Sequence, residues 1–235
     1  MVDKTMIYEK KVKCPVCNKE FMTTKVKTSK LKLVKRDEDF LNYYKGEEHP
    51  LKYEVFLCPF CGYAAMEKRF DKIKPSGKSI ILRNVTPKWH KRDLKPERSF
   101  EDAVNIYKLA LYCGEIIKKS KVELGNICLR IGWLYRIQGI DNEEKRFLRY
   151  GRDLFEESYY KEDLRENGYD EVTLSYLIGE LSRRLGENEK ALNWFNTVFT
   201  VCRNNKNPVI EEMARDQWNL VREGRAQKAN TTDNE

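Results

Sequence analysis

The sequence predicts an α+β protein: a small β-rich head over residues 1–95, an all-helical region over 96–225 and a frayed polar tail over 226–235. Three observations predict this order. Two Cys-x-x-Cys pairs lie in the head, and five of the seven prolines punctuate it. After Pro96, apolar residues recur at the i, i+3, i+4 spacing of amphipathic helices.

Short alternating runs predict the strands of the head. Residues 21–28 and 30–36 alternate apolar and polar side chains with a period of two, and residues 53–58 do so more loosely. This period is typical of a strand with one buried face. Residues 68–95, which follow, are predicted to be a basic linker.

The helical region begins with a predicted N-cap. Ser99 is followed three residues later by Asp102, a variant of the capping box, and residues 103–114 then place apolar side chains on one face. Breaks at glycine and asparagine divide the rest into further predicted helices at 122–138, 143–160, 170–185, 188–203 and 208–223.

The helices also show the spacing of a tetratricopeptide repeat, in which small residues let antiparallel helices approach and an aromatic side chain fills the gap. The best match is the set Ile178, Gly179, Ser182, Gly186, Ala191, Phe195 and Val198. A stretched match contains Ile131, Gly132, Tyr135, Gly139, Gly151, Phe155 and Ser158. The fold prediction is therefore a tetratricopeptide-like helical solenoid, with a plain helical bundle as the alternative.

In this repeat frame, the side chains that face the concave groove include two aromatic residues and two arginines: Trp133, Arg136, Tyr176 and Arg183. Aromatic and arginine side chains are the residues most often found at binding hot spots. The sequence thus predicts a groove that holds a partner protein or peptide. The alternative is that Trp133 and Tyr176 pack between repeats.

The two cysteine pairs predict a metal site. Cys14, Cys17, Cys58 and Cys61 stand in the runs CPVC and CPFC, and Gly62 supplies a positive-φ position after the second pair. Four thiolates close a tetrahedral shell, which predicts a structural zinc ion, with rubredoxin-like iron as the alternative. His49 and His90 are not needed as ligands, and we expect both to be ordinary surface or loop residues.

Charge is unevenly distributed along the chain. Residues 1–95 carry 23 Lys and Arg against 12 Asp and Glu, a net charge of +11, whereas the remainder carries −3. The basic excess lies mostly in residues 68–95, where it is interleaved with Phe70, Trp89 and His90. This pattern makes nucleic acid the alternative partner, bound through the head.

Three runs together resemble a known family: CPVCNKEF (14–21), SKLKLVKRDEDF (29–40) and YYKGEEHPLKYEVFLCPFCGYAA (43–65). They are similar to the bacterial family filed as domain of unknown function 2225. The resemblance implies a zinc-ribbon-like head followed by tetratricopeptide-like helices, with no established activity. It draws attention to Arg36, Asp37 and Asp39, which form either a polar site beside the metal or the turns and ion pairs of the insert.

The function predicted from the sequence is that of a non-enzymatic, zinc-binding adaptor. No nucleophile–base pair and no phosphate-binding glycine-rich loop is visible, so no catalytic residue and no small-molecule substrate is predicted. No apolar run is long enough to cross a membrane, and the first residues lack the pattern of a secretory signal. We therefore expect a cytoplasmic protein.

Overall fold

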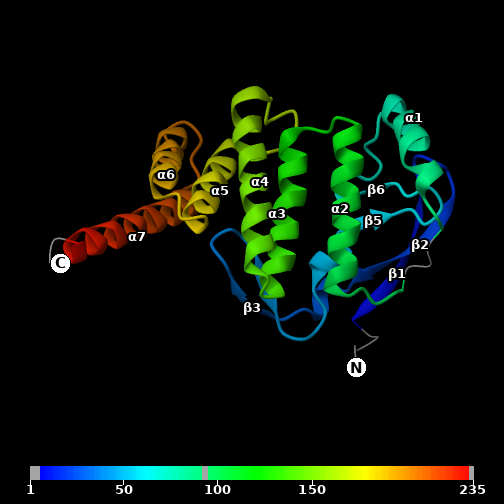
Figure 1. Cartoon of the computed structure of the whole chain (residues 1–235), viewed down its shortest axis with the longest axis horizontal. Helices are drawn as coiled ribbons and strands as arrows, with labels where there is room; N and C mark the ends of the chain where they lie inside the picture. The colour runs from blue at the N-terminus through cyan, green and yellow to red at the C-terminus, as the bar shows by residue number, and fades with distance from the viewer. Residues whose placement is uncertain (1–5, 92–94, 233–235) are drawn as a thin grey trace. The chain divides into compact units, whose positions relative to one another are not determined.

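The computed structural model describes residues 6–91 and 95–232, with side chains up to residue 224 (Figure 1). Its strands are β1 (Ile7–Lys13), β2 (Glu20–Val26), β3 (Leu33–Arg36), β4 (Asn42–Tyr44), β5 (Val55–Leu57) and β6 (Ala64–Met66). Its helices are α1 (Pro75–Asn84), α2 (Phe100–Ile116), α3 (Lys121–Ile137), α4 (Asp141–Lys161), α5 (Glu171–Arg184), α6 (Asn188–Cys202) and α7 (Pro208–Thr232). The predicted order, small sheets first and helices after, is confirmed.

The strands form two-stranded antiparallel sheets, each made by neighbours in sequence. β1 pairs with β2 from Ile7 opposite Val26 through to Lys13 opposite Glu20. β5 pairs with β6, and β3 pairs with β4 across a bulge. A two-stranded hairpin is marginally stable alone, so each sheet depends on what packs against it.

Contacts divide the described residues into two compact units. The first comprises residues up to Asp37, Leu41–Lys119 and Asn126–Glu144. The second comprises Glu38–Phe40, Ser120–Gly125 and the chain from Lys145 onward. Unit 1 therefore includes α2 together with the β-rich head, and helices α3 and α4 contribute residues to both units.

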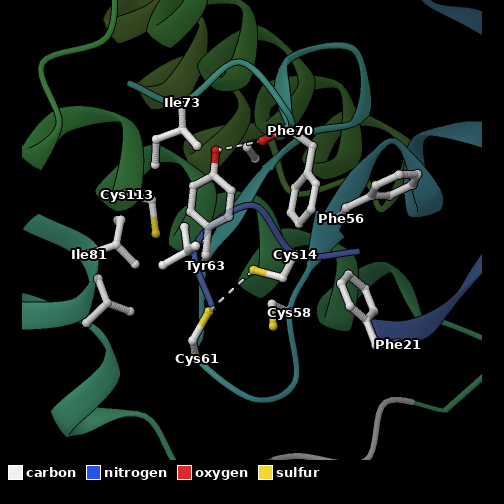
Figure 2. Packing of buried hydrophobic residues seen from close by; sticks show 13 residues of the cluster. Cys14, Phe21, Phe56, Cys58, Cys61, Tyr63, Phe70, Ile73, Ile81 and Cys113 are labelled. Atoms are coloured by element: carbon white, nitrogen blue, oxygen red, sulfur yellow. Dashed lines mark hydrogen bonds between the residues drawn. The ribbon is translucent and has the colours of Figure 1, made fainter. Parts of the chain in front are cut away.

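The core of unit 1 forms where α2 lies against β5 and β6 (Figure 1). Its buried side chains come from β2, β5 and β6, from the two cysteine-containing turns, from α1 and α2, and from the chain on either side of α1 (Figure 2): Cys14, Val16, Phe21, Phe56, Cys58, Cys61, Tyr63, Ala65, Phe70, Ile73, Ile81, Val85 and Cys113. The predicted capping box begins α2, with the Asp102 amide donating to Ser99 and the Ser99 amide donating to Asp102.

Arg98, immediately before that cap, ties the start of α2 to the sheets. Its side chain is 4% exposed and donates to the carbonyl oxygens of Lys52 and Val55 at 3.2 and 3.0 Å. It also donates to Thr23 Oγ1 at 3.2 Å. Hydrogen bonds from its two Nη atoms offset part of the hydration that the buried guanidinium loses, so Arg98 is a structural residue of unit 1.

In unit 2, α5, α6 and α7 pack side by side (Figure 1). A Cβ atom on Gly179 would lie 2.8 Å from the Phe195 ring, so α5 and α6 approach closely only because residue 179 has no side chain. Gly125 stands in the same relation to Phe155, at 2.6 Å. The predicted pairing of small and aromatic residues is present at Gly179, whereas the role of Gly125 was not predicted.

Two segments are more helical than predicted. Residues 68–95, expected to be a linker, contain α1, which begins at Pro75 and buries Gly77 and Ile81. Proline is favoured in the first helical turn, where its missing N–H costs nothing. The tail was predicted to fray after residue 225, but α7 continues to Thr232. Residues 225–229 are good helix formers, without proline or glycine.

The longest helix is α7, at 25 residues. The first half of this helix contains four charged residues, which make it too polar for a membrane span: Glu211, Glu212, Arg215 and Asp216. Among the residues that the structure describes, no helix combines the length and the apolar character that crossing a bilayer requires.

Candidate metal centre

The first cysteine pair lies in the turn between β1 and β2. The Cys14 amide donates to the Lys19 carbonyl at 2.9 Å, and the Asn18 amide donates back to the Cys14 carbonyl at 2.9 Å. Asn18 has φ +62°, a left-handed conformation that asparagine accepts more readily than most residues. The turn therefore directs Cys14 and Cys17 to the same side.

The second pair repeats this geometry between β5 and β6. The Cys58 amide donates to the Tyr63 carbonyl at 2.9 Å, and the Gly62 amide donates to the Cys58 carbonyl at 3.0 Å. Gly62 has φ +75°. Asn18 and Gly62 thus occupy equivalent positions in two matching turns, which we call the first and second knuckle (residues 14–19 and 58–63).

The two knuckles bring four sulfur atoms together. All four Sγ atoms lie within 4.8 Å of one another, with Cys14–Cys61 and Cys17–Cys58 each at 3.6 Å (Figure 2 shows the first contact). A tetrahedral site with metal–sulfur bonds of about 2.3 Å has sulfur–sulfur edges of about 3.8 Å. A disulfide would need about 2.05 Å. The spacing fits a shared metal ion, and it does not fit a covalent bond.

The sulfur cluster is shielded from water. Cys14 and Cys58 are fully buried, Cys61 is 1% exposed and Cys17 is partly exposed. Hydrogen bonds from Cys14 and Cys61 lower the pKa of the Cys58 thiol. The hydrogen bond to Cys58 raises the pKa of Cys14, and the hydrogen bonds to Cys14 and Cys58 raise the pKa of Cys61. A bound divalent cation would let all four thiols ionise.

Two residues that follow β6 in the chain donate hydrogen bonds to the second knuckle. Trp89 Nε1 donates to the Pro59 carbonyl at 2.9 Å, and Thr86 Oγ1 donates to the Cys61 carbonyl at 3.1 Å. Cys113 of α2 also contacts the second knuckle, with its Sγ 3.9 Å from the Gly62 carbonyl oxygen. Burial raises the pKa of the Cys113 thiol to about 11, so Cys113 packs as a neutral thiol.

The donor set is therefore a closed group of four cysteines. It fits zinc, and it fits rubredoxin-like iron equally well. Four protein ligands leave no open position for water or substrate, which favours a structural role for the ion. The other cysteines, Cys113, Cys128 and Cys202, are buried and free of disulfides.

The two histidines differ in environment. His90 is exposed, as expected. His49 lies in a loop, as expected, but it is 8% exposed and is therefore not a surface residue. It caps a short 3-10 helix, Pro50–Tyr53, by accepting the Leu51 amide on Nδ1 at 3.2 Å. Its Nε2 lies 2.9 Å from the Asn42 carbonyl. Burial lowers the pKa of His49.

The three residues considered for a polar site differ in environment. Arg36 is exposed on β3, opposite Asn42. Asp37 Oδ2 accepts from Arg136 Nη1 at 2.9 Å and from the Tyr43 hydroxyl at 3.1 Å, within unit 1. Asp39 is fully buried and belongs to unit 2. The structure thus gives Asp37 the ion-pairing role considered as the alternative.

The predicted groove residues on α3 are also engaged within the chain. Trp133 is 7% exposed, and the Arg130 guanidinium lies 5.4 Å from the centre of its ring. Arg136 pairs with Glu144 at 2.6 Å as well as with Asp37. In this structure the arginine predicted to meet a partner carboxylate meets two carboxylates of its own unit.

On α5, Tyr176 is fully buried and Arg183 pairs with Glu180 at 2.7 Å. The Tyr176 ring belongs to a core cluster with Phe195 of α6, at 6.1 Å between ring centroids. Its hydroxyl donates to the Glu38 carbonyl at 3.0 Å. The burial of Trp133 and Tyr176 matches the alternative weighed for them, packing within the fold.

Comparison with known proteins gives one family match. Residues 7–221 match the model of a family described as "Uncharacterized protein conserved in bacteria (DUF2225)". A curated relative from Borreliella burgdorferi, described as "Uncharacterized protein", is 26% identical over 157 residues. That alignment covers 58% of this chain and 54% of the relative, so the chain matches about half of the relative's length. No solved structure matches.

Proposed function

The chain belongs to the DUF2225 family of bacterial proteins, and we propose that it is a non-enzymatic adaptor of the cytoplasm. Its four cysteines hold one structural zinc ion, and its helices bind a segment of a partner protein. The proposal has two parts, the ion and the partner, and each rests on a separate observation.

The zinc ion is supported by the spacing and burial of the four sulfur atoms. The ion would join two hairpins whose knuckles are far apart in sequence, with Cys14 and Cys61 separated by 47 positions. Binding free energy of such a site becomes folding free energy, because the unfolded chain has no preformed site. Zinc is preferred over iron because a structural role requires no redox change.

The adaptor role is carried by one observation in unit 2: a face of α5 already holds a short turn segment of the chain, Glu38–Phe40. Close helix contacts at Gly179 with Phe195, and at Gly125 with Phe155, support the tetratricopeptide-like arrangement proposed for this region. Helical repeats of this kind commonly present a face to an extended peptide.

A non-catalytic role is supported by the chemistry of a polar hollow in unit 2. This pocket of about 880 Å³ lies between the α4–α5 and α6–α7 loops. Its carboxylates serve local structure: Asp163 accepts the Arg165 amide, Asp170 caps α5, and Glu171 accepts from Tyr159. A nucleophilic mechanism would instead pair a base with an activated serine or cysteine.

The partner is tested by affinity purification of the tagged, zinc-loaded chain from its native cell, with and without nuclease. The proposal expects a protein partner that stays bound after nuclease treatment and is lost when the α5 face is altered. Recovery of nucleic acid alone, with all bound proteins released by nuclease, would contradict it.

Nucleic acid is the second candidate, favoured by a basic and aromatic patch at the second knuckle. The Lys19 and Lys91 ammonium groups lie 5.0 and 5.9 Å from the centre of the Phe60 ring. Aromatic rings among lysines can stack on bases. Phe70, however, is 1% exposed and cannot stack as the sequence suggested. Binding of generic DNA or RNA that weakens steeply with salt would favour this candidate.

A further inference from the structure

The segment Glu38–Phe40 is held by α5 through both backbone and side-chain contacts, all within unit 2. The Tyr176 hydroxyl donates to the Glu38 carbonyl at 3.0 Å. The Phe40 ring packs on the Tyr176 ring, with 5.6 Å between centroids, at the edge of the core cluster that includes Phe195. A tyrosine on α5 thus contacts two residues of the segment.

An arginine on α5 contacts its acidic side chains. Arg184 Nη2 lies 3.1 Å from Glu38 Oε2 and 3.8 Å from Asp39 Oδ1. Arg184 also contacts Glu180 at 2.7 Å, but Glu180 is paired with Arg183 as well. Arg183 and Arg184 therefore both pair with the buried Glu180 carboxylate, and the second positive charge is balanced by the acidic side chains of the segment.

The conformation of Phe40 carries a backbone cost that belongs to the turn between β3 and β4, in which the Asp37 amide donates to the Leu41 carbonyl at 2.8 Å. Phe40 has φ +74°, a left-handed conformation that is disfavoured for a bulky residue. This turn returns the chain to β4 (Asn42–Tyr44). A segment that belonged to another protein would not need to turn back, so it could make the same contacts without that strain.

We infer that this face of α5, formed by Tyr176, Glu180, Arg183 and Arg184, is a recognition site for a short acidic–aromatic protein segment. The chain's own Glu38–Phe40 occupies the site until a partner segment of the same chemistry displaces it. The inference rests on the proposed adaptor function and names the chemistry of its partner: two acidic residues followed by an aromatic one.

The test uses a fluorescent peptide with the sequence of residues 34–42, VKRDEDFLN, and the full-length, zinc-loaded chain. Its anisotropy is measured with the wild-type chain and with the double variant Glu38→Ala/Phe40→Ala. A site that is mostly occupied by its own segment shows a weakened apparent affinity. We expect the double variant to bind the peptide about tenfold or more tightly than the wild type.

Two controls define the site. A peptide with alanine at the positions of Glu38, Asp39 and Phe40 should not bind the double variant. Adding Arg184→Ala to the double variant should abolish binding, whereas adding Arg203→Ala, at an exposed arginine of the same unit, should leave it unchanged. Circular dichroism and thermal unfolding establish that each variant is folded.

Two results would overturn the inference. A folded double variant that does not bind the peptide would show that α5 does not recognise a segment with these side chains. Failure of the double variant to fold would show that Glu38–Phe40 is a fixed part of the core and is not displaceable. If native partners are still captured with nuclease present in either case, the adaptor function survives and only its assignment to this face of α5 fails.

Discussion

Gly62 and Trp89 are packed so closely that a Cβ atom on Gly62 would lie 2.7 Å from the indole ring. The contact sets the indole against the second knuckle, where Trp89 Nε1 donates to the Pro59 carbonyl at 2.9 Å. Gly62 therefore serves two needs at once: the positive φ of the turn and the close approach of the ring.

Gly62→Ala should destabilise the zinc-loaded protein more than a change of backbone conformation alone would. Gly139→Ala is the matched control, because Gly139 has φ +69° and a Cβ atom added there would contact no other residue's atoms within 4 Å. The positive φ costs about 1 kcal/mol in either variant, and Trp89 must shift only in the first. Thermal unfolding should show the larger loss for Gly62→Ala; equal losses would contradict the packing role of Trp89.

Cys14→Ser or Cys58→Ser should remove the bound metal and unfold much of unit 1. Helices α5–α7 keep their own core around Tyr176 and Phe195, so much of the helical circular dichroism should remain. Cys202→Ala, a buried cysteine outside the cluster, is the control and should keep its metal. Loss of all helical signal in the Cys14 or Cys58 variant would show that the two units do not fold separately.

The sequence was most informative where chemistry is local. The four cysteines and the Ser99 cap follow from short motifs, and both are present in the structure. Helix positions followed from apolar spacing for the same reason. The role of Asn18 as the equivalent of Gly62 was missed, because only glycine was considered for a positive φ.

Tertiary contacts could not be read from local patterns. Arg98 carried no signal in the sequence, yet its side chain is buried and hydrogen-bonds to residues 43 to 75 positions away. Tyr176 has the spacing of a groove residue, but its hydroxyl meets Glu38, 138 positions earlier. No helical or strand period encodes a contact at such separation, so the occupant of the α5 face required the structure.

Tyr176→Ala should lower the free energy of unfolding by about 3–5 kcal/mol, because it leaves a cavity beside Phe195 in a fully buried position. Tyr176→Phe keeps the ring and removes only the hydrogen bond to the Glu38 carbonyl, at a cost of about 1 kcal/mol. Chemical denaturation measures both. A Tyr176→Ala variant as stable as the wild type would mean that the ring is exposed in solution.

His49 should make stability depend on pH. Burial lowers its pKa and outweighs the hydrogen bond with the Asn42 carbonyl and the charge of Glu54, which both raise it; the charge of Lys52 lowers it further. The unfolded chain therefore binds the proton more readily, and stability is present above the unfolded pKa of about 6.5 and falls as the pH drops below it. His49→Asn keeps a cap acceptor without titrating, so the loss of unfolding free energy between pH 7 and pH 5.5 should be smaller in the variant. Identical losses in the two proteins would exclude His49 as the cause.

Reversing the charge of Lys72, Lys74 and Lys78 should abolish nonspecific DNA binding by the head and leave partner capture unchanged. These lysines lie in the basic segment that includes α1, and phosphate contacts depend on their charge. Affinity purification and a filter-binding assay on the same variant separate the two activities. Loss of the native partner in this variant would favour the nucleic-acid function.

The most direct test of the metal centre is X-ray absorption spectroscopy combined with elemental analysis of protein purified without chelators. Four sulfur atoms within 4.8 Å of one another predict about one zinc per chain, coordinated by sulfur alone at about 2.3 Å. Protein that is folded but free of metal, or a metal with nitrogen or oxygen ligands in place of a cysteine, would contradict the account.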